Sequence, residues 1–193
     1  GCASPGINPN VFKPVEDKKE HKKRLGLPED SIIVGTVMRN QKRKLFIELM
    51  KAFKIFIDTA PKEIADKTFL YLHTSYPERV GWDIESGIIE YGLGSKVICT
   101  YICRSCNSWC CKKYSGAIST CEKCGSKASF MPSVSQGLST DDLVSVYNTF
   151  DLYAQYAICE GFGMPQVEAA ACGVPVAATN YSAMEDVVQF TNG

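Results

Sequence analysis

Apolar runs alternate along the chain with stretches of helical period. The runs are short and rich in β-branched and aromatic residues, a composition typical of strands buried on both faces of a parallel sheet. They lie at residues 31–37, 68–73, 96–101, 151–156 and 175–178. Between the first two runs, apolar residues recur at helical spacing from Leu45 to Ile57. Strand, helix, strand is the repeating unit of an α/β fold, so we expect a parallel sheet flanked by helices.

A short helix is predicted between Pro165 and Gly173. Proline suits the first turn of a helix, where its missing N–H has no partner, and glycine suits the left-handed position just past the end. The helix begins beside the loop Gly161-Phe162-Gly163. Free amides and the positive end of the helix dipole meet there, so this loop can hold an anionic or hydroxyl-rich ligand.

Charge is balanced, with 21 Lys and Arg against 21 Asp and Glu and a pI near 6.9. Strong nonspecific binding to nucleic acid is therefore not expected. The basic stretch 16–25 could be a phosphate or membrane-surface patch, but a solvated helix is the favoured interpretation. No apolar run is long enough to span a bilayer and no signal-peptide pattern opens the chain, so we expect a cytoplasmic protein, peripheral to a membrane at most.

A second basic segment, residues 39–44, follows the first predicted strand. Open α/β sheets bind ligands at the carboxyl ends of their strands. Several cations at the start of a helix are unfavourable unless an anion is present, so we interpret this loop as a phosphate-binding loop rather than a solvated helix start.

The residues from Glu160 to Glu168, with Gly-Phe-Gly-Met-Pro after the first glutamate and Ala-x-Ala-Cys-Gly-x-Pro-Val after the second, resemble a family signature. It is the donor-sugar signature of retaining glycosyltransferases of the GT-B fold, glycosyl transferases group 1 (family 4-like). The resemblance implies a Rossmann-like donor domain in which Glu160 lies by the sugar hydroxyls and Glu168 accepts hydrogen bonds from the nucleotide ribose. The donor-binding residues implied are Gly161, Phe162, Gly163, Met164, Pro165 and Glu168.

The basic loop resembles the donor-phosphate loop of the same family, with Arg39 and Lys44 at the matching positions. Thr36 stands where many relatives have arginine, which leaves the register open, so Lys42 or Arg43 could replace one of these two. The implied catalytic residues are Arg39, Lys44 and Glu160. The implied reaction is hexosyl transfer with retention, in which fixed cations stabilise the departing diphosphate. No Asp-x-Asp motif occurs, so no catalytic metal is expected.

The resemblance also implies an organisation. Residues 1–15 resemble an interdomain linker, and residues 16–101 with 131–193 the nucleotide-sugar-binding domain. The N-terminal acceptor domain is then an expected partner outside this sequence, as are the closing helices after residue 193. We expect the chain to bind a UDP- or GDP-type sugar but to turn over poorly alone. The acceptor cannot be read from these residues.

Cysteines mark the remaining segment, residues 102–130, as an inserted zinc ribbon. Two Cys-x-x-Cys pairs, Cys103 with Cys106 and Cys121 with Cys124, have the spacing of such a site. Four sulfur ligands leave no open coordination position, so the Zn²⁺ should be structural. Cys110 or Cys111 could substitute for a member of the first pair. The clustering favours metal binding in a reducing compartment over disulfides.

Two hypotheses follow. In the first, the chain is a glycosyltransferase donor domain with an inserted ribbon. In the second, a noncatalytic transferase-like scaffold displays the ribbon to protein or nucleic acid. Retention of both glutamates and of the basic loop favours the first.

Overall fold

A computed structural model of the chain describes residues 6–191. The start of the predicted linker, residues 1–5, and the end of the predicted domain, residues 192–193, lie outside this range. Among the described helices, none is both long and apolar enough to cross a membrane.

Five parallel strands form the centre of the molecule in the order β3-β2-β1-β7-β8. They are β1 (Ile32–Val37), β2 (Thr68–His73), β3 (Val97–Cys103), β7 (Leu152–Gln155) and β8 (Val176–Ala178). Each coincides with one of the predicted apolar runs. The chain order reverses direction beside β1, which places the topological switch point between β1 and β7.

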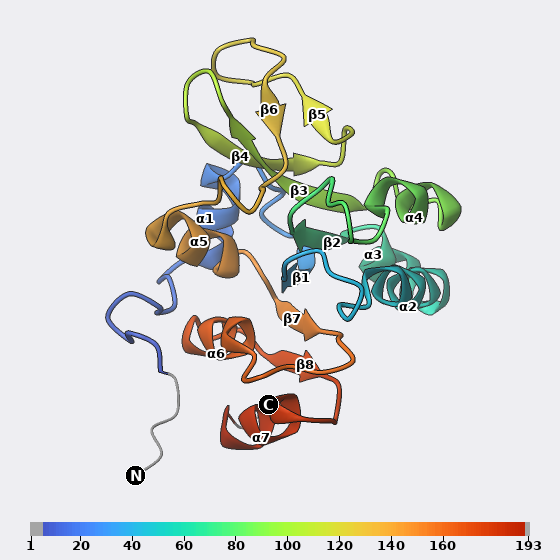
Figure 1. Ribbon diagram of the computed structural model, residues 1–193, viewed down its shortest axis with the longest axis vertical. Helices are drawn as coiled ribbons and strands as arrows, with labels where there is room; N and C mark the ends of the chain where they lie inside the picture. Colours follow the sequence, from blue (N-terminus) through green and yellow to red (C-terminus); the bar gives the residue numbers. More distant parts are fainter. Residues whose placement is uncertain (1–5, 192–193) are drawn as a thin grey trace.

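Helices cover both faces of this sheet (Figure 1). The described helices are α1 (Lys18–Arg24), α2 (Phe46–Thr59), α3 (Lys62–Ala65), α4 (Ile84–Glu90), α5 (Thr140–Tyr147), α6 (Met164–Ala171) and α7 (Ala183–Thr191). Side chains alternate along β2: Phe69 and Tyr71 pack in the core under α5 and α6, and Leu70 and Leu72 pack in the core under α2 and α4. The predicted α/β fold is confirmed, because burial on both faces is what continuous apolar strands require.

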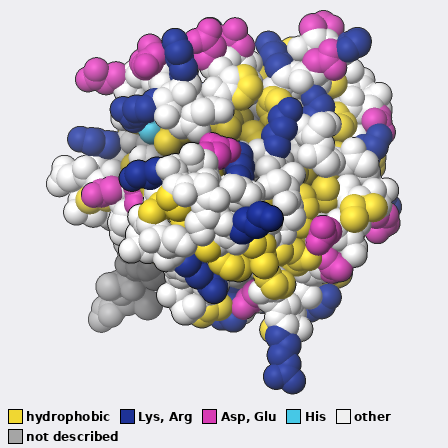
Figure 2. Space-filling view, turned by 90° about the horizontal axis from the view of Figure 1, so that it is seen from above, with side chains coloured by type: hydrophobic (Ala, Val, Ile, Leu, Met, Phe, Trp, Pro, Cys, Tyr) yellow, Lys and Arg dark blue, Asp and Glu magenta, His cyan; other side chains and the backbone are white. Residues whose placement is uncertain are grey.

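The strands of the ribbon segment belong to the same sheet as the parallel strands. They are β4 (Trp109–Lys113), β5 (Ile118–Ser119) and β6 (Ser129–Phe130). β3 extends beyond its predicted end at residue 101 to Cys103, because Ile102 pairs antiparallel with Trp109 of β4 and with Phe130 of β6, and Cys103 pairs with Ser129. Seen from the ribbon end, basic and acidic side chains are interspersed among exposed hydrophobic ones (Figure 2). The division of residues 102–130 from the rest as a unit stays a prediction.

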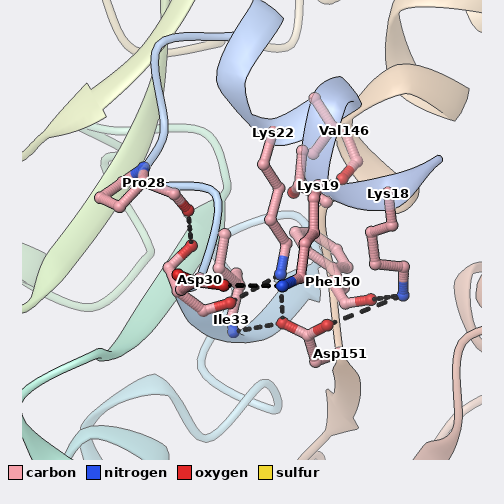
Figure 3. A network of polar contacts seen from close by, with 11 residues as sticks. Lys18, Lys19, Lys22, Pro28, Asp30, Ile33, Val146, Phe150 and Asp151 are labelled. Atoms are coloured by element: carbon pink, nitrogen blue, oxygen red, sulfur yellow. Dashed lines mark hydrogen bonds and ion pairs between the residues drawn. The ribbon is translucent and has the colours of Figure 1, made fainter.

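Helix α1 is largely exposed and ends before Gly26, as predicted for a solvated helix, but one of its lysines is buried. Lys22 is buried, and its Nζ donates to the Ser31 carbonyl at 2.7 Å and to Asp151 Oδ2 at 2.6 Å (Figure 3). The same carboxylate oxygen accepts the Ile33 N–H at 2.8 Å. Asp151 thus joins α1 to the start of β1 and β7, at the end of the sheet opposite the carboxyl ends of the strands. A buried, paired Lys22 is not available as part of a phosphate or membrane patch.

Gly35 in β1 is required by close packing. A Cβ at this position would lie 2.3 Å from ring carbons of Phe150, which is fully buried against Tyr71 with ring centroids 5.3 Å apart. We expect Gly35→Ala to lower the free energy of unfolding by at least about 1–3 kcal/mol, measured by urea denaturation. Gly94→Ala is the matched control, since no atom lies within 4 Å of its Cβ. Equal stability of the two variants would contradict this packing.

Candidate functional site

A cavity of about 410 Å³ opens at the carboxyl ends of β1 and β2. Its walls come from segments far apart in the sequence: the basic loop after β1, the end of β2, the loop after β6, and helices α5 and α6. The lining residues are Val37, Met38, Arg39, Gln41, Arg43, Lys44, His73, Thr74, Ser75, Pro132, Ser133, Val134, Gly137, Leu143, Pro165 and Glu168. This is the edge at which open α/β sheets bind ligands.

Glu160 is held against the basic loop. Its carboxylate forms ion pairs with Lys44 and with Arg43, whose Nη1 lies 2.8 Å from Oε2. The side chains of Lys44 and Glu160 are 8% and 7% exposed. Gln155 Nε2 donates to Glu160 Oε1 at 2.7 Å, and Tyr153 in turn donates to Gln155 Oε1 at 2.5 Å. The prediction that Lys44 and Glu160 share one edge of the sheet agrees with this geometry.

Backbone pairing fixes the basic loop in this position. The Ile158 N–H donates to the Arg43 carbonyl at 2.8 Å, and the Leu45 N–H donates to the Tyr156 carbonyl at 3.0 Å. The indole N–H of Trp82 donates to the Lys44 carbonyl at 2.5 Å. The segment that leads into Glu160 therefore forms a short ladder with the loop that carries the cations. This ladder was not predicted from the sequence, because neither it nor the Trp82 hydrogen bond leaves a periodic signal.

Arg39 lies on the cavity wall but away from Glu160. Its guanidinium makes a bidentate pair with Glu78, with both N···O distances 3.0 Å, and its side chain is half exposed. Lys42, the other alternative, lies over the Trp82 ring at 4.2 Å. Of the four candidate cations, Arg43 and Lys44 are the two that form ion pairs with Glu160 among the described residues. A catalytic role for Arg39 stays a prediction.

Helix α6 brings its first turn to the cavity. It begins at Met164, one residue before the predicted start at Pro165, because Gly163 takes the N-cap position with a left-handed backbone at φ 82°. Gly173 closes the other end with φ 73°, while the Val174 N–H donates to the Ala169 carbonyl, as a Schellman motif requires. Gly161 and Phe162 lie in the loop between Glu160 and this helix.

Glu168 reaches the cavity from α6. Its Oε2 accepts a hydrogen bond from Tyr147 of α5 at 2.6 Å. Burial raises the pKa of Glu168, and the Tyr147 hydrogen bond opposes that shift. The tyrosine thereby holds the carboxylate at the wall. This partner was not identified from the sequence, where Tyr147 is one of several apolar positions in a helix.

Two further groups at the wall have shifted protonation. Burial lowers the pKa of His73 to about 4, so the ring is neutral near pH 7, and its Nδ1 lies 2.9 Å from Thr100 Oγ1. Burial also lowers the pKa of Lys44 to about 8, with the charge of Arg43 acting in the same direction. A lysine with this pKa is still mostly protonated at pH 7 and can bind an anion.

Four cysteines form a compact cluster in the ribbon. The sulfurs of Cys103 and Cys124 lie 3.7 Å apart, those of Cys106 and Cys121 lie 3.8 Å apart, and all four are within 4.8 Å of one another. A tetrahedral ion with Zn–S bonds of about 2.3 Å separates its ligands by about 3.8 Å. The four thiols therefore fit a metal such as zinc.

The two Cys-x-x-Cys turns have the same backbone design. The N–H groups of Asn107 and Gly125 donate to the carbonyls of Cys103 and Cys121, each at 2.9 Å, from left-handed conformations at φ 54° and 72°. Within the described residues, Cys111 is not in the cluster, since its thiol donates to the Leu25 carbonyl at 3.3 Å. Nor does Cys110 belong to it. The geometry agrees with the four-cysteine assignment rather than with a variant that uses either residue.

Comparison with known proteins finds similarity in sequence and in fold. A family model described as "Glycosyl transferases group 1" matches residues 130–192, about a third of the chain. The serotype-specific mannosyltransferase WbdA of Escherichia coli is 35% identical over 51 residues, which cover 26% of this chain and 6% of that protein.

Three solved structures illustrate the likeness in fold. Sucrose-phosphate synthase from Thermosynechococcus elongatus superposes with a TM-score of 0.62 at 22% identity, covering 95% of this chain and 35% of that one. The C-terminal domain of the group 1 glycosyl transferase LpcC from Francisella tularensis gives 0.61 at 17% identity, covering 91% and 71%. Anabaena Alr3699/HepE, solved with UDP-glucose, gives 0.61 at 20% identity, covering 95% and 39%.

The chain thus spans less than two fifths of sucrose-phosphate synthase and HepE and a small part of WbdA, but most of the isolated C-terminal domain of LpcC. At these sequence identities, the similarity to the solved structures establishes the fold alone. The predicted family resemblance is confirmed in sequence and in fold. Residues 130–192 carry the sequence signature of glycosyl transferases group 1, and the chain has the Rossmann-like fold of the GT-B glycosyltransferases.

Proposed function

We propose that this chain is the donor-binding half of a retaining hexosyltransferase and that its cavity takes a UDP- or GDP-linked sugar. The observation that carries the proposal is the buried contact of Glu160 with Lys44 and Arg43 at the carboxyl edge of the sheet. A buried cation and carboxylate, with the exposed Arg43 beside them near a helix N-terminus, form a site for a group that is both anionic and rich in hydroxyls.

The diphosphate would lie between the basic loop and the start of α6. Lys44 and Arg43 supply positive charge from one side, and the positive end of the α6 helix dipole supplies it from the other. Arg39 can join them if it exchanges Glu78 for a phosphate oxygen at the rim. Because negative charge grows on the departing diphosphate as the glycosidic bond breaks, these fixed charges would stabilise the transition state more than the ground state.

The two glutamates take the other parts of the donor. Glu168, held by Tyr147, would accept hydrogen bonds from the ribose hydroxyls, and Glu160 would accept hydrogen bonds from the sugar hydroxyls at the opposite end of the donor. The donors named for the relatives, UDP-glucose in the HepE structure and mannose in the name of WbdA, make UDP-glucose and GDP-mannose the first donors to test. The acceptor would come from an N-terminal domain outside this sequence, and without it the chain would turn over slowly.

We further propose that the four-cysteine cluster holds one structural Zn²⁺. The sulfur separations match a closed tetrahedron, and a closed tetrahedron has no position for substrate. The described cysteines are unpaired, consistent with a reducing compartment such as the cytoplasm.

Calorimetric titration with UDP-glucose, GDP-mannose and ADP-glucose tests the donor site. We expect saturable binding of one of them, weakened about tenfold by Glu168→Gln, because a charged hydrogen-bond acceptor for the ribose is lost. Glu63→Gln, an exposed substitution on α3, is the control and should leave the affinity unchanged. If none of the three binds, while an interaction with protein or nucleic acid is abolished by Cys121→Ser, the noncatalytic scaffold replaces this proposal.

A further inference from the structure

The loop that follows the ribbon forms one wall of the cavity. We call residues 132–137, between β6 and α5, the cavity loop. Pro132, Ser133, Val134 and Gly137 line the cavity opposite the basic loop. The loop closes on itself, since the Ser133 N–H donates to the Gln136 carbonyl at 2.9 Å and the Gln136 N–H donates back at 3.2 Å. Its internal shape is therefore fixed locally, but its position depends on what holds its ends.

The upstream end is held by the ribbon. β6 is two residues long, and it pairs with the last two residues of β3 on one side and with β5 on the other. Met131 is buried after it, and the Pro132 carbonyl accepts the Tyr76 N–H at 3.2 Å. A two-residue strand is a weak anchor by itself, so the placement of the cavity loop relies on the segment that positions β5 and β6.

That segment has almost no apolar core of its own. Between residues 104 and 128, only Cys111 and Cys121 are buried, and Cys121 is one of the four clustered cysteines. A stretch of this length cannot offset its loss of conformational entropy with so little burial. Metal binding by the four thiolates is the interaction large enough to order it.

Arg104 connects the first Cys-x-x-Cys turn to the cavity loop directly. It lies between Cys103 and Cys106, and its backbone N–H donates to the Ala128 carbonyl at 2.9 Å. Its guanidinium stacks over the Phe130 ring at 4.1 Å, and its Nε donates to Gln136 Oε1 at 3.3 Å. One residue of the metal-binding turn thus contacts both β6 and the cavity loop through its side chain.

We propose that the metal-bound ribbon positions the wall of the cavity, and that Arg104 is the positioning residue that joins the first Cys-x-x-Cys turn to loop 132–137. The ribbon then acts as a brace: it supports ligand binding in a cavity that none of its cysteines contacts. The identity of the ligand as a nucleotide sugar rests on the proposed function, whereas the coupling of ribbon to loop does not.

The test measures the loop and the ligand separately on the zinc-loaded 193-residue chain. We expect Arg104→Ala to retain one zinc per chain, to raise amide exchange of residues 132–137 about tenfold, and to weaken binding of the donor nucleotide about three- to tenfold. Arg104→Lys, which keeps a cation over Phe130, should recover part of both effects. Lys123→Ala is the matched control, because Lys123 lies exposed in the second Cys-x-x-Cys turn and its side chain forms no hydrogen bond or ion pair within residues 6–191.

Removal of zinc by a chelator provides the second arm. Loss of protection in residues 132–137, with β1 and β2 still protected, supports the brace. Protection of the loop that is unchanged in both the zinc-free chain and Arg104→Ala overturns it. Because amide exchange needs no ligand, a chain that binds no nucleotide at all would refute the proposed function while the coupling is still decided.

Discussion

Removing the metal from the four-cysteine cluster is expected to unfold residues 104–128 while the parallel sheet stays folded. Binding of a structural zinc ion contributes on the order of 10 kcal/mol to the folding of the segment that holds it. The ribbon segment contributes to the two apolar clusters that cover the sheet chiefly through residues of β4, among them Cys111. Most residues of both clusters therefore stay buried when the segment unfolds.

Limited proteolysis before and after chelation measures this outcome. We expect new cleavage between Cys106 and Cys121 in the zinc-free chain and in Cys121→Ser, with a protected product that contains β1 and β2. Cys159→Ser is the control, since Cys159 is exposed and lies outside the cluster. If the zinc-free chain resists protease as the loaded chain does, the ribbon is held by packing rather than by metal.

The parallel strands could be predicted because each has a chemical reason to be apolar throughout. β2, for example, buries Phe69 and Leu70 against opposite layers of helices, so apolar side chains are favoured on both of its faces. The ribbon strands gave no such signal. β5 has two residues, one exposed, and β4 ends in exposed lysine, so what orders them is pairing with β3 and the four thiols.

The candidate site divides in the same way. Glu160 lies in the loop after β7 and Glu168 lies within α6, so the predicted order of strand, loop and helix was enough to expect both at the carboxyl edge of the sheet. The choice among four cations in one loop could not be predicted, because a loop has no periodicity that fixes side-chain direction. Partners distant in sequence determine which cations contact Glu160. Arg39 pairs with Glu78 at the rim, whereas backbone hydrogen bonds with residues 156–158 place Arg43 and Lys44 beside Glu160.

Lys44→Met is expected to have two separable effects. The first is on stability: Glu160 loses its most buried partner, and breaking a buried ion pair from one side costs about 3–5 kcal/mol, here reduced because Arg43 and Gln155 still contact the carboxylate. The second is on donor binding, where loss of a charged hydrogen bond to the diphosphate costs about 1.5–3 kcal/mol. Urea denaturation measures the first effect, and calorimetry with the donor nucleotide measures the second.

The double variant Lys44→Met with Glu160→Gln separates the two effects. Neutralising Glu160 removes the unpaired buried charge, so we expect the free energy of unfolding to recover toward that of the unsubstituted chain. Nucleotide binding should not recover, because the cation is still missing. Lys54→Met, which removes one member of an exposed pair with Asp58 on α2, should change neither quantity by more than about 0.5 kcal/mol. If the double variant regains both stability and affinity, Lys44 serves only to neutralise Glu160, and the diphosphate is held by other groups.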